Sequence, residues 1–323
     1  MLRICLPLII FAQLTLANSA HAVERLQLRH LIAQLESIDR DTRLAAADNV
    51  KVYGRDGVGA VPALLAALRL EYGLARGIFL DALAAVGPGD TRVVSALSHS
   101  VFNDGASLTA QSLEDLGEMG ASALPAMPAI LYVLYSAKPL DAERAVAGIG
   151  PAAAPILVAE LGRTADPLRR GRLTAALQHM GAHPRAVDAV PHLISLLNHN
   201  DPRQKRSGLH ALRGYGEAGR MAIPTMEGIV RLTYGPDPLR PLACLTIGSL
   251  GQVGVPTLIN LAVTGDVISR ISAIAGINEA GLAAFSAVTT LQQLRRDRNE
   301  AVASAAKNAL EKLAALQREL QKG

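Results

Sequence analysis

The sequence predicts an all-α fold, a solenoid of stacked two-helix repeats, from a fixed repeat length and from the way Pro and Gly punctuate each repeat. A unit of about 33 residues recurs along the 323-residue chain. Each unit has a Pro, or one residue in its place, at the start of an apolar segment: Pro62, Val94, Pro128, Pro155, Pro191, Pro224, Pro256 and Thr289. These positions lie 27 to 36 residues apart. Periods of this length indicate stacked helical hairpins.

Each Pro is expected to open the second helix of its repeat, because the first helical turn does not use the missing N–H and the fixed φ is already helical. Glycines ahead of it are expected to end the first helix in the left-handed conformation. They are Gly87, Gly117, Gly120, Gly148, Gly181, Gly216 and Gly251. Asp-Pro pairs at 166–167, 201–202 and 237–238 supply an N-cap and a first-turn Pro for the next repeat. The predicted order is helix A, Gly-rich turn, helix B and Asp-Pro turn.

The best-preserved copies are Gly-Ala-Val-Pro-Ala-Leu-Leu at 59–65 and Asp-Ala-Val-Pro-His-Leu-Ile at 188–194. The pattern resembles the HEAT-repeat family, in particular its short bacterial, bilin-lyase-like repeats with a Gly-x-x-Ala-x-Pro-x-Leu core. The resemblance covers residues 26–320. The resemblance implies a right-handed α-solenoid whose B helices line the concave side. It also implies that the solenoid binds other proteins. Two units depart from the pattern, one with a helix A shortened to 141–149 and the last with Thr289 in place of Pro.

Residues 1–22 are predicted to be a secretory signal peptide. Arg3 precedes an apolar stretch at 4–16, and Ala20-His21-Ala22 fits a small-x-small cleavage site. The alternative is an uncleaved membrane anchor, but about 13 apolar positions are fewer than the roughly 20 that a spanning helix needs. We therefore expect export across the inner membrane to the periplasm, with no transmembrane segment left after cleavage.

Residues 23–323 are predicted to form a single solenoid of about nine repeats that ends in a capping helix at 299–323. That last segment carries Leu310, Leu313, Leu316 and Leu320 on one face, as a terminal cap requires. Half of the residues are apolar but only 3% are aromatic and none is Trp, so Ala and Leu are expected to do the packing. After cleavage Cys244 is the one Cys left, and its apolar neighbours predict a buried, inert thiol.

A central segment, 163–220, concentrates positive charge. It holds ten Lys or Arg against four acidic residues, and five of the eight His. We expect this basic stripe to attract an acidic protein partner, with Arg169, Arg170, Lys205 and Arg206 as candidate contacts. The alternative is that the arginines pair with acids in neighbouring turns and leave an ordinary solvated face. Nucleic acid is not expected as a partner, because an exported chain seldom meets it.

The histidines are not expected to hold a metal. Gly181 separates His179 from His183 and breaks the helix that would align them. His192 and His199 lie seven apart on a predicted helix and face the same way, but no third ligand stands at a suitable spacing. HEAT-type di-iron hydroxylases bind iron through His-Glu dipeptides, and the sequence has none. We therefore expect no metal, no cofactor and no catalytic residue.

Two hypotheses of different class remain. The first is an exported, non-enzymatic scaffold that binds an acidic protein along the concave face or the basic stripe. Its candidate contacts on helix B are Tyr132, Tyr135, His192, Ser195, His199 and Arg231, although the two tyrosines could instead cover a gap beside the shortened repeat. The second is a protein-modifying enzyme or accessory subunit resembling the bilin lyases. The residues shared with those lyases are mostly the Gly, Pro, Ala and Leu of the repeat. Such residues indicate the fold but do not indicate an activity.

Overall fold

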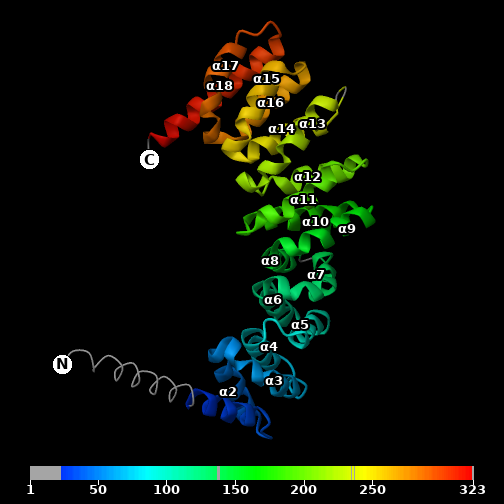
Figure 1. Cartoon of the computed structure of the whole chain (residues 1–323), viewed down its shortest axis with the longest axis vertical. Coiled ribbons are helices and arrows are strands. Elements are labelled where there is room, and N and C mark those ends of the chain that lie inside the picture. The colour runs from blue at the N-terminus through cyan, green and yellow to red at the C-terminus, as the bar shows by residue number, and fades with distance from the viewer. Residues whose placement is uncertain (1–22, 137–138, 234, 236, 322–323) are drawn as a thin grey trace, which may run out of the picture. The chain divides into compact units, whose positions relative to one another are not determined.

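The computed structural model describes residues 23–136, 139–233, 235 and 237–321, so the predicted signal peptide lies outside the described residues. All regular elements within these ranges are helices, and they alternate as the repeat predicts (Figure 1). The predicted fold class, an all-α solenoid of stacked two-helix repeats, is confirmed. The chain divides into two compact units, one up to Leu131 and one from Tyr132 onward. Whether 23–323 forms one continuous solenoid stays a prediction.

The first unit begins with a helical segment at 23–35. Its A helices are α2 (Arg40–Val50), α4 (Ala75–Val86) and α6 (Ala106–Glu118), and its B helices are α3 (Val61–Leu68), α5 (Thr91–Asn103) and the start of α7 (Met127–Leu134). The 3-10 turns η1 (Lys51–Ala60) and η2 (Gly120–Ala126) connect A to B. Neighbouring A helices pack on each other, α2 on α4 and α4 on α6.

The second unit continues the same order. Its A helices are α8 (Leu140–Ile149), α10 (Pro167–His179), α12 (Pro202–Leu212), α14 (Leu239–Ser249), α16 (Val267–Glu279) and α18 (Glu300–Leu320). Its B helices are α9 (Ala154–Arg163), α11 (Val190–Leu197), α13 (Ile223–Leu232), α15 (Val255–Thr264) and α17 (Val288–Leu294). The turns are η3 (Gly150–Ala153), η4 (Met180–Ala182), η5 (Ala186–Ala189), η6 (Gly216–Ala222), η7 (Gly251–Val253) and η8 (Gly281–Ala287).

Local turn chemistry explains where the helices start. Pro62 stands in the first turn of α3, and the equivalent Pro does so in α9, α11, α13 and α15. The Asp166 carboxylate accepts the Leu168 N–H at 2.9 Å, and the Asp201 carboxylate accepts the Arg203 N–H at 2.8 Å. Each bond satisfies one of the N–H groups that a helix start leaves without a partner.

The predicted glycine ends are only partly right. Gly120, Gly216 and Gly251 have the left-handed φ that the prediction requires. Gly117 and Gly148 instead lie inside α6 and α8. Because α8 runs on to Ile149, the left-handed residue of this repeat is Gly150, which caps the helix with a φ of +76°.

The stretch Leu140–Arg163 is long and apolar enough, by composition alone, to cross a membrane. It is composed of two repeat helices, α8 and α9, separated by the turn η3. The residues that face the stack, among them Val146, Leu157 and Leu161, are fully or almost fully buried. The apolar character of this stretch is thus that of core helices in a repeat.

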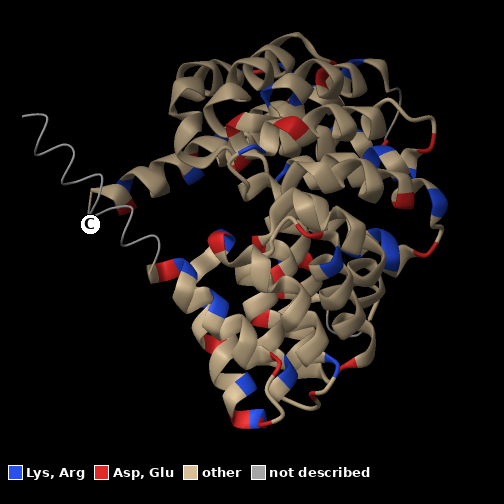
Figure 2. Ribbon diagram, turned by 60° about the horizontal axis from the view of Figure 1, so that its bottom comes forward, with Lys and Arg blue, Asp and Glu red and all other residues tan. Residues whose placement is uncertain are grey.

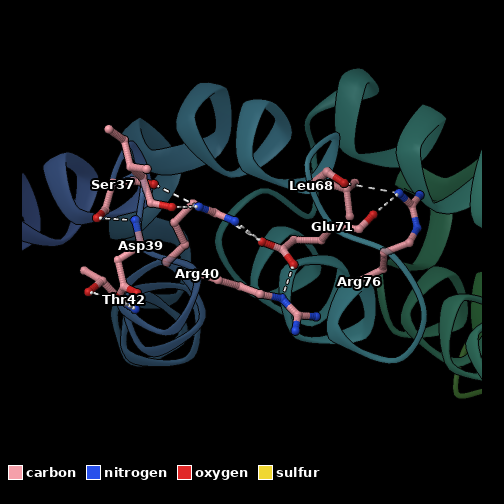
Figure 3. Close-up of polar contacts among 9 residues, drawn as sticks. Ser37, Asp39, Arg40, Thr42, Leu68, Glu71 and Arg76 are labelled. Atoms are coloured by element: carbon pink, nitrogen blue, oxygen red, sulfur yellow. Dashed lines mark hydrogen bonds and ion pairs between the residues drawn. The ribbon is translucent and has the colours of Figure 1, made fainter.

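Arginines on A helices connect one repeat to the next (Figure 3). The Arg43 guanidinium donates to Glu71 Oε1 at 2.5 Å and to the backbone carbonyls of Ser37 and Ile38 at 2.9 Å. Arg40 Nε donates to the other Glu71 oxygen at 2.9 Å. Burial works to raise the pKa of Glu71, but the hydrogen bonds and charges of the two arginines outweigh it and hold that pKa below its usual value. The bridge therefore joins α2 to the chain that follows α3.

The same bridge recurs at other repeats. Arg76 binds Asp104 at 3.2 Å, Arg240 binds Asp266 at 2.8 Å, and Arg270 binds Asp297. In each pair the acid lies 26 to 28 residues after its arginine, which is roughly one repeat further along. Each bridge thus adds a polar nearest-neighbour term to the apolar contact between repeats.

Backbone contact between α14 and α16 shows how closely the A helices pack. A Cβ added at Gly276 would lie 2.3 Å from the Cys244 carbonyl oxygen, and one at Gly248 would lie 2.1 Å from the Gly276 carbonyl oxygen. Neither position has room for a methyl group. Cys244 is fully buried, as expected, and burial raises the pKa of its thiol to about 12.

The C-terminal helix α18 covers the end of the second unit. It packs on α16 and α17, with Leu313 buried and Leu310 and Leu316 half-buried. Leu320 is 58% exposed, so the last turn extends past the apolar face that the cap covers.

Candidate functional site

The basic stripe, 163–220, is largely neutralised by its own surroundings. Six of its ten cationic side chains make an ion pair: Arg163 with Glu160, Arg169 with Asp166, Arg185 with Asp188, Arg203 with Asp201, Arg213 with Glu279 and Arg220 with Glu217. Figure 2 shows basic and acidic positions close together at many bends of the chain. The alternative, in which the arginines pair with nearby acids, thus accounts for more than half of the positive side chains in the stripe.

Two further arginines of the stripe bind backbone carbonyls. Arg172 donates to the carbonyls of Leu134 and Ser136. Arg170, a predicted contact residue, is only 8% exposed and donates to the Leu161 carbonyl at 2.9 Å and to Ser207 Oγ at 3.3 Å. Its side chain helps to hold α10 against the end of α9 and against α12, and burial lowers its pKa. Arg170 is therefore not an open surface contact.

Lys205 and Arg206 are the two cations of the stripe that remain. Both stand on α12, Lys205 half-buried and Arg206 exposed. Neither makes an ion pair with any residue in the described part of the chain. The sequence named both as candidate contacts, and these two keep their charge available.

Two other predicted residues, Tyr135 and Arg169, form a pair that the sequence did not foresee. The Arg169 guanidinium carbon lies 4.8 Å from the centroid of the Tyr135 ring, a cation–π distance. Burial raises the pKa of the Tyr135 hydroxyl, the nearby Glu160 charge adds to the effect, and Arg169 opposes it. That hydroxyl has no hydrogen-bond partner among the described residues. Tyr132, three residues earlier, is 61% exposed.

The predicted contacts on α11 and α13 lie at the surface. Ser195 and His199 are exposed and His192 is half-buried, and Ser195 Oγ donates to the His192 carbonyl at 2.6 Å. The expectation that His192 and His199 share a helix is wrong, because α11 ends at Leu197. His199 lies in the following turn, where its Nδ1 accepts the Asp201 N–H at 3.0 Å. Arg231 is paired within its own helix, with Glu227 at 2.8 Å.

Outside the stripe, the described titratable side chains do not gather as a metal site, and one partly buried carboxyl stands out. No group of three or more His, Cys, Asp or Glu side chains gathers as a metal site in the described ranges. The most perturbed carboxyl is Asp115 on α6, whose pKa burial raises to about 7, with smaller contributions from Asp81, Glu118 and Glu114 that Lys51 opposes. One oxygen of Asp115 is buried without a partner among the described residues, while Asp81 accepts a hydrogen bond from Gln111.

A hollow of about 590 Å³ lies between the A helices α10 and α12. Its walls are Ala165, Pro167, Arg170, Gly171, Thr174, Ala175, Gln178, Arg203, Arg206, Ser207 and His210. None of these residues is acidic, and most of the wall is apolar. Arg170 and Arg206 of this wall were predicted contacts of the basic stripe, whereas Thr174, Gln178, Arg203 and His210 were not singled out from the sequence.

A second hollow, of about 670 Å³, lies in the first unit and is lined mainly by α3 and α5. It also contains three arginines, but Arg76 is paired with Asp104 and Arg92 with Asp90 at 2.6 Å. Only Arg69 remains unpaired among the described residues. The hollow beside α12 therefore has the larger uncompensated positive charge.

Comparison with known proteins adds little beyond the fold. No family model and no curated protein matches the chain. Solved structures similar to it include human deoxyhypusine hydroxylase in complex with glycerol (22% identity, 81% of this chain and 97% of that chain, TM-score 0.33). Kap121p (13% identity, 89% and 37%, TM-score 0.38) and an engineered protein (17% identity, 89% and 98%, TM-score 0.29) are also similar. The stacked helix pairs themselves place the fold in the HEAT- and armadillo-like class of repeat proteins.

Proposed function

We propose that this chain is an exported, non-enzymatic scaffold that binds an acidic protein partner. Its fold belongs to a class that works by presenting long rows of side chains from successive repeats. The finer resemblance, to the short bacterial HEAT repeats with the Gly-x-x-Ala-x-Pro-x-Leu core, supports a binding role, and the signal peptide predicted at 1–22 supports a role in the periplasm.

The observation that carries the proposal is the state of Lys205 and Arg206. Eight of the ten cations in the basic stripe are bound by carboxylates or carbonyls of the protein, and these two are not bound by any carboxylate or carbonyl of the described ranges. Charge that is not used inside the stack produces a field outside it, and such a field steers an oppositely charged partner toward the surface. The exposed Ser195 and Tyr132, with the half-buried His192, supply polar and aromatic contacts on the B helices.

An affinity capture from envelope extract tests this function. The chain 23–323 is immobilised and washed at low and at raised salt, and the eluate is analysed by mass spectrometry and for metal. We expect a specific protein to elute with salt and to be lost when Lys205 and Arg206 are both changed to Glu. The matched control is Arg163→Glu, since Arg163 is already paired with Glu160 at 2.7 Å.

Three results would count against the scaffold. If the variant with Lys205 and Arg206 both changed to Glu captures the partner as well as Arg163→Glu does, the basic stripe is excluded as the binding surface. Absence of any captured protein at low salt would leave the scaffold unsupported. A stoichiometric metal or coloured ligand would favour the protein-modifying alternative.

A further inference from the structure

We infer that the hollow between α10 and α12 is a pocket for an acidic peptide side chain with an aliphatic neighbour, presented by the partner protein. The inference rests on the proposed function and deepens it, because it names where and by what chemistry the partner is held. Of the two surfaces that the sequence indicated, it favours the basic stripe on the A helices over the row of side chains on the B helices.

The pocket exists because two helix faces meet where one of them carries small residues. Pro167, Gly171, Thr174 and Gln178 follow one another three or four residues apart along α10 and so share one face. Across from them, the lining residues of α12 also lie about one turn apart: Arg203, then Arg206 with Ser207, then His210. A Cβ at Gly171 would meet no heavy atom within 4 Å. Small side chains thus leave open space that larger ones would fill.

The charge of this pocket is positive and incompletely neutralised. Arg203 is held by Asp201 at 3.0 Å, but Arg206 makes no ion pair with a described residue. Arg170 binds only carbonyls and a hydroxyl, so its buried charge has no carboxylate in contact. Burial lowers the pKa of His210, and the nearby Arg213 and Arg206 lower it further. His210 is therefore neutral at pH 7, and the cationic character of the pocket comes from the arginines.

The lining selects a carboxylate on an aliphatic stem. The apolar wall formed by Ala165, Pro167 and Ala175 suits methylene groups, while Arg206 and the polar ends of Thr174 and Gln178 suit the carboxylate. Arg170 and Arg203 are already bound by the protein, so Arg206 is the one arginine of the lining left to pair with an anion, which favours a single carboxylate over a phosphate. A Glu next to an aliphatic residue, in an acidic segment of a protein, matches both parts of the wall.

Fluorescence anisotropy with a defined probe tests the pocket. The probe is a short labelled peptide in which Glu alternates with Leu, and its matched control has Gln in place of Glu. We expect Arg206→Glu and Gly171→Leu each to weaken binding at least about tenfold. The Leu fills the pocket without a clash at Cβ and is a better helix former than Gly, so that variant is expected to fold.

The control variant is Arg220→Glu, which reverses an equal charge in the same stripe but outside the pocket. Arg220 is already paired with Glu217, and we expect less than about a threefold loss. Equal losses in Arg220→Glu and Arg206→Glu, with none in Gly171→Leu, would overturn the pocket but leave a basic scaffold in place.

Two other outcomes also refute the pocket. If the Gln peptide binds as well as the Glu peptide, or if inorganic phosphate at low millimolar concentration displaces the probe completely, the site does not select an acidic side chain. If a single-stranded oligonucleotide binds and the Glu peptide does not, the pocket serves another class of partner. Failure of the wild-type protein to bind the probe, when envelope capture still yields a partner that Lys205 and Arg206 hold, would refute the pocket and spare the proposed function.

Discussion

Removing the Glu71 carboxylate should destabilise the start of the first unit far more than its small size suggests. Glu71 is 4% exposed and, among the described residues, is the one acid that pairs with Arg43, whose side chain is 9% exposed. Breaking a buried ion pair by removing one partner costs about 3–5 kcal/mol, because a buried charge is left uncompensated. Arg43 keeps the carbonyls of Ser37 and Ile38, so we expect Glu71→Ala to fall at the lower end, about 3 kcal/mol.

Hydrogen exchange measured by mass spectrometry is the suitable assay, because a repeat protein opens locally and a global midpoint would average the effect. A loss of about 3 kcal/mol corresponds to more than about 100-fold faster exchange at the slowest amides of α2 and α3. Glu71→Gln, which keeps the acceptor oxygen but loses the charge, should give a smaller increase.

The matched control is Glu217→Ala. Glu217 pairs with Arg220 at 2.6 Å, but the two side chains are 74% and 63% exposed, and an exposed pair contributes about 0–1 kcal/mol. If Glu71→Ala changes exchange in α2 and α3 no more than Glu217→Ala changes exchange in its own repeat, the bridge does not couple the repeats and the reasoning fails.

Three further predictions concern single positions. Because the pKa of Asp115 is raised from 3.8 to about 7, its ionised form opposes folding, and the free energy of unfolding rises as pH falls through 7 toward 3.8. Asp115→Asn should therefore be more stable than wild type in urea at pH 8 and lose most of that advantage by pH 5. Gly276→Ala should cost about 1–3 kcal/mol in urea unfolding because its methyl meets the backbone of α14, whereas Gly228→Ala, with open space at Cβ inside α13, should gain about 0.5–1 kcal/mol. Cys244 should resist iodoacetamide at pH 8 until the protein is unfolded, as peptide mapping of the alkylated site will show.

Each of these three has an outcome that contradicts it. An advantage of Asp115→Asn that is the same at both pH values would mean that the carboxyl does not titrate as described. Equal stabilities of Gly276→Ala and Gly228→Ala would mean that α14 and α16 do not touch through their backbones. Rapid alkylation of Cys244 in the folded protein would mean that the thiol is accessible.

Helix order could be predicted from the sequence because its signals are local. An Asp cap and a Pro act within two or three residues, so Asp166 and Pro167 are enough to set the start of α10. His199 was misplaced because the exact end of a short helix depends on which carbonyls find partners in the turn after it. The hydrogen bond that the Asp201 N–H donates to His199 Nδ1 forms only once the chain has turned.

The pocket could not be predicted, because it depends on helices from two different repeats and on the absence of large side chains between them. In the sequence, Gly171 indicates only a position of low helix propensity. The arginines that hold neighbouring repeats together did leave a signal: Arg43, Arg170 and Arg270 each stand at the fourth position of their A helix. Comparing the repeats position by position would have marked Arg170 as a structural residue instead of a surface contact.

The bridges between repeats also restrict where this protein can be shortened. Arg240 is 2% exposed, and the acid that compensates it, Asp266, belongs to the next repeat. A chain that stopped at the apparent repeat boundary after α15 would keep the arginine and discard its carboxylate. A fragment should therefore end past Asp266. The unit that can be cut without leaving an unpaired charge is thus shifted, by the length of one turn, from the two-helix hairpin seen in the ribbon.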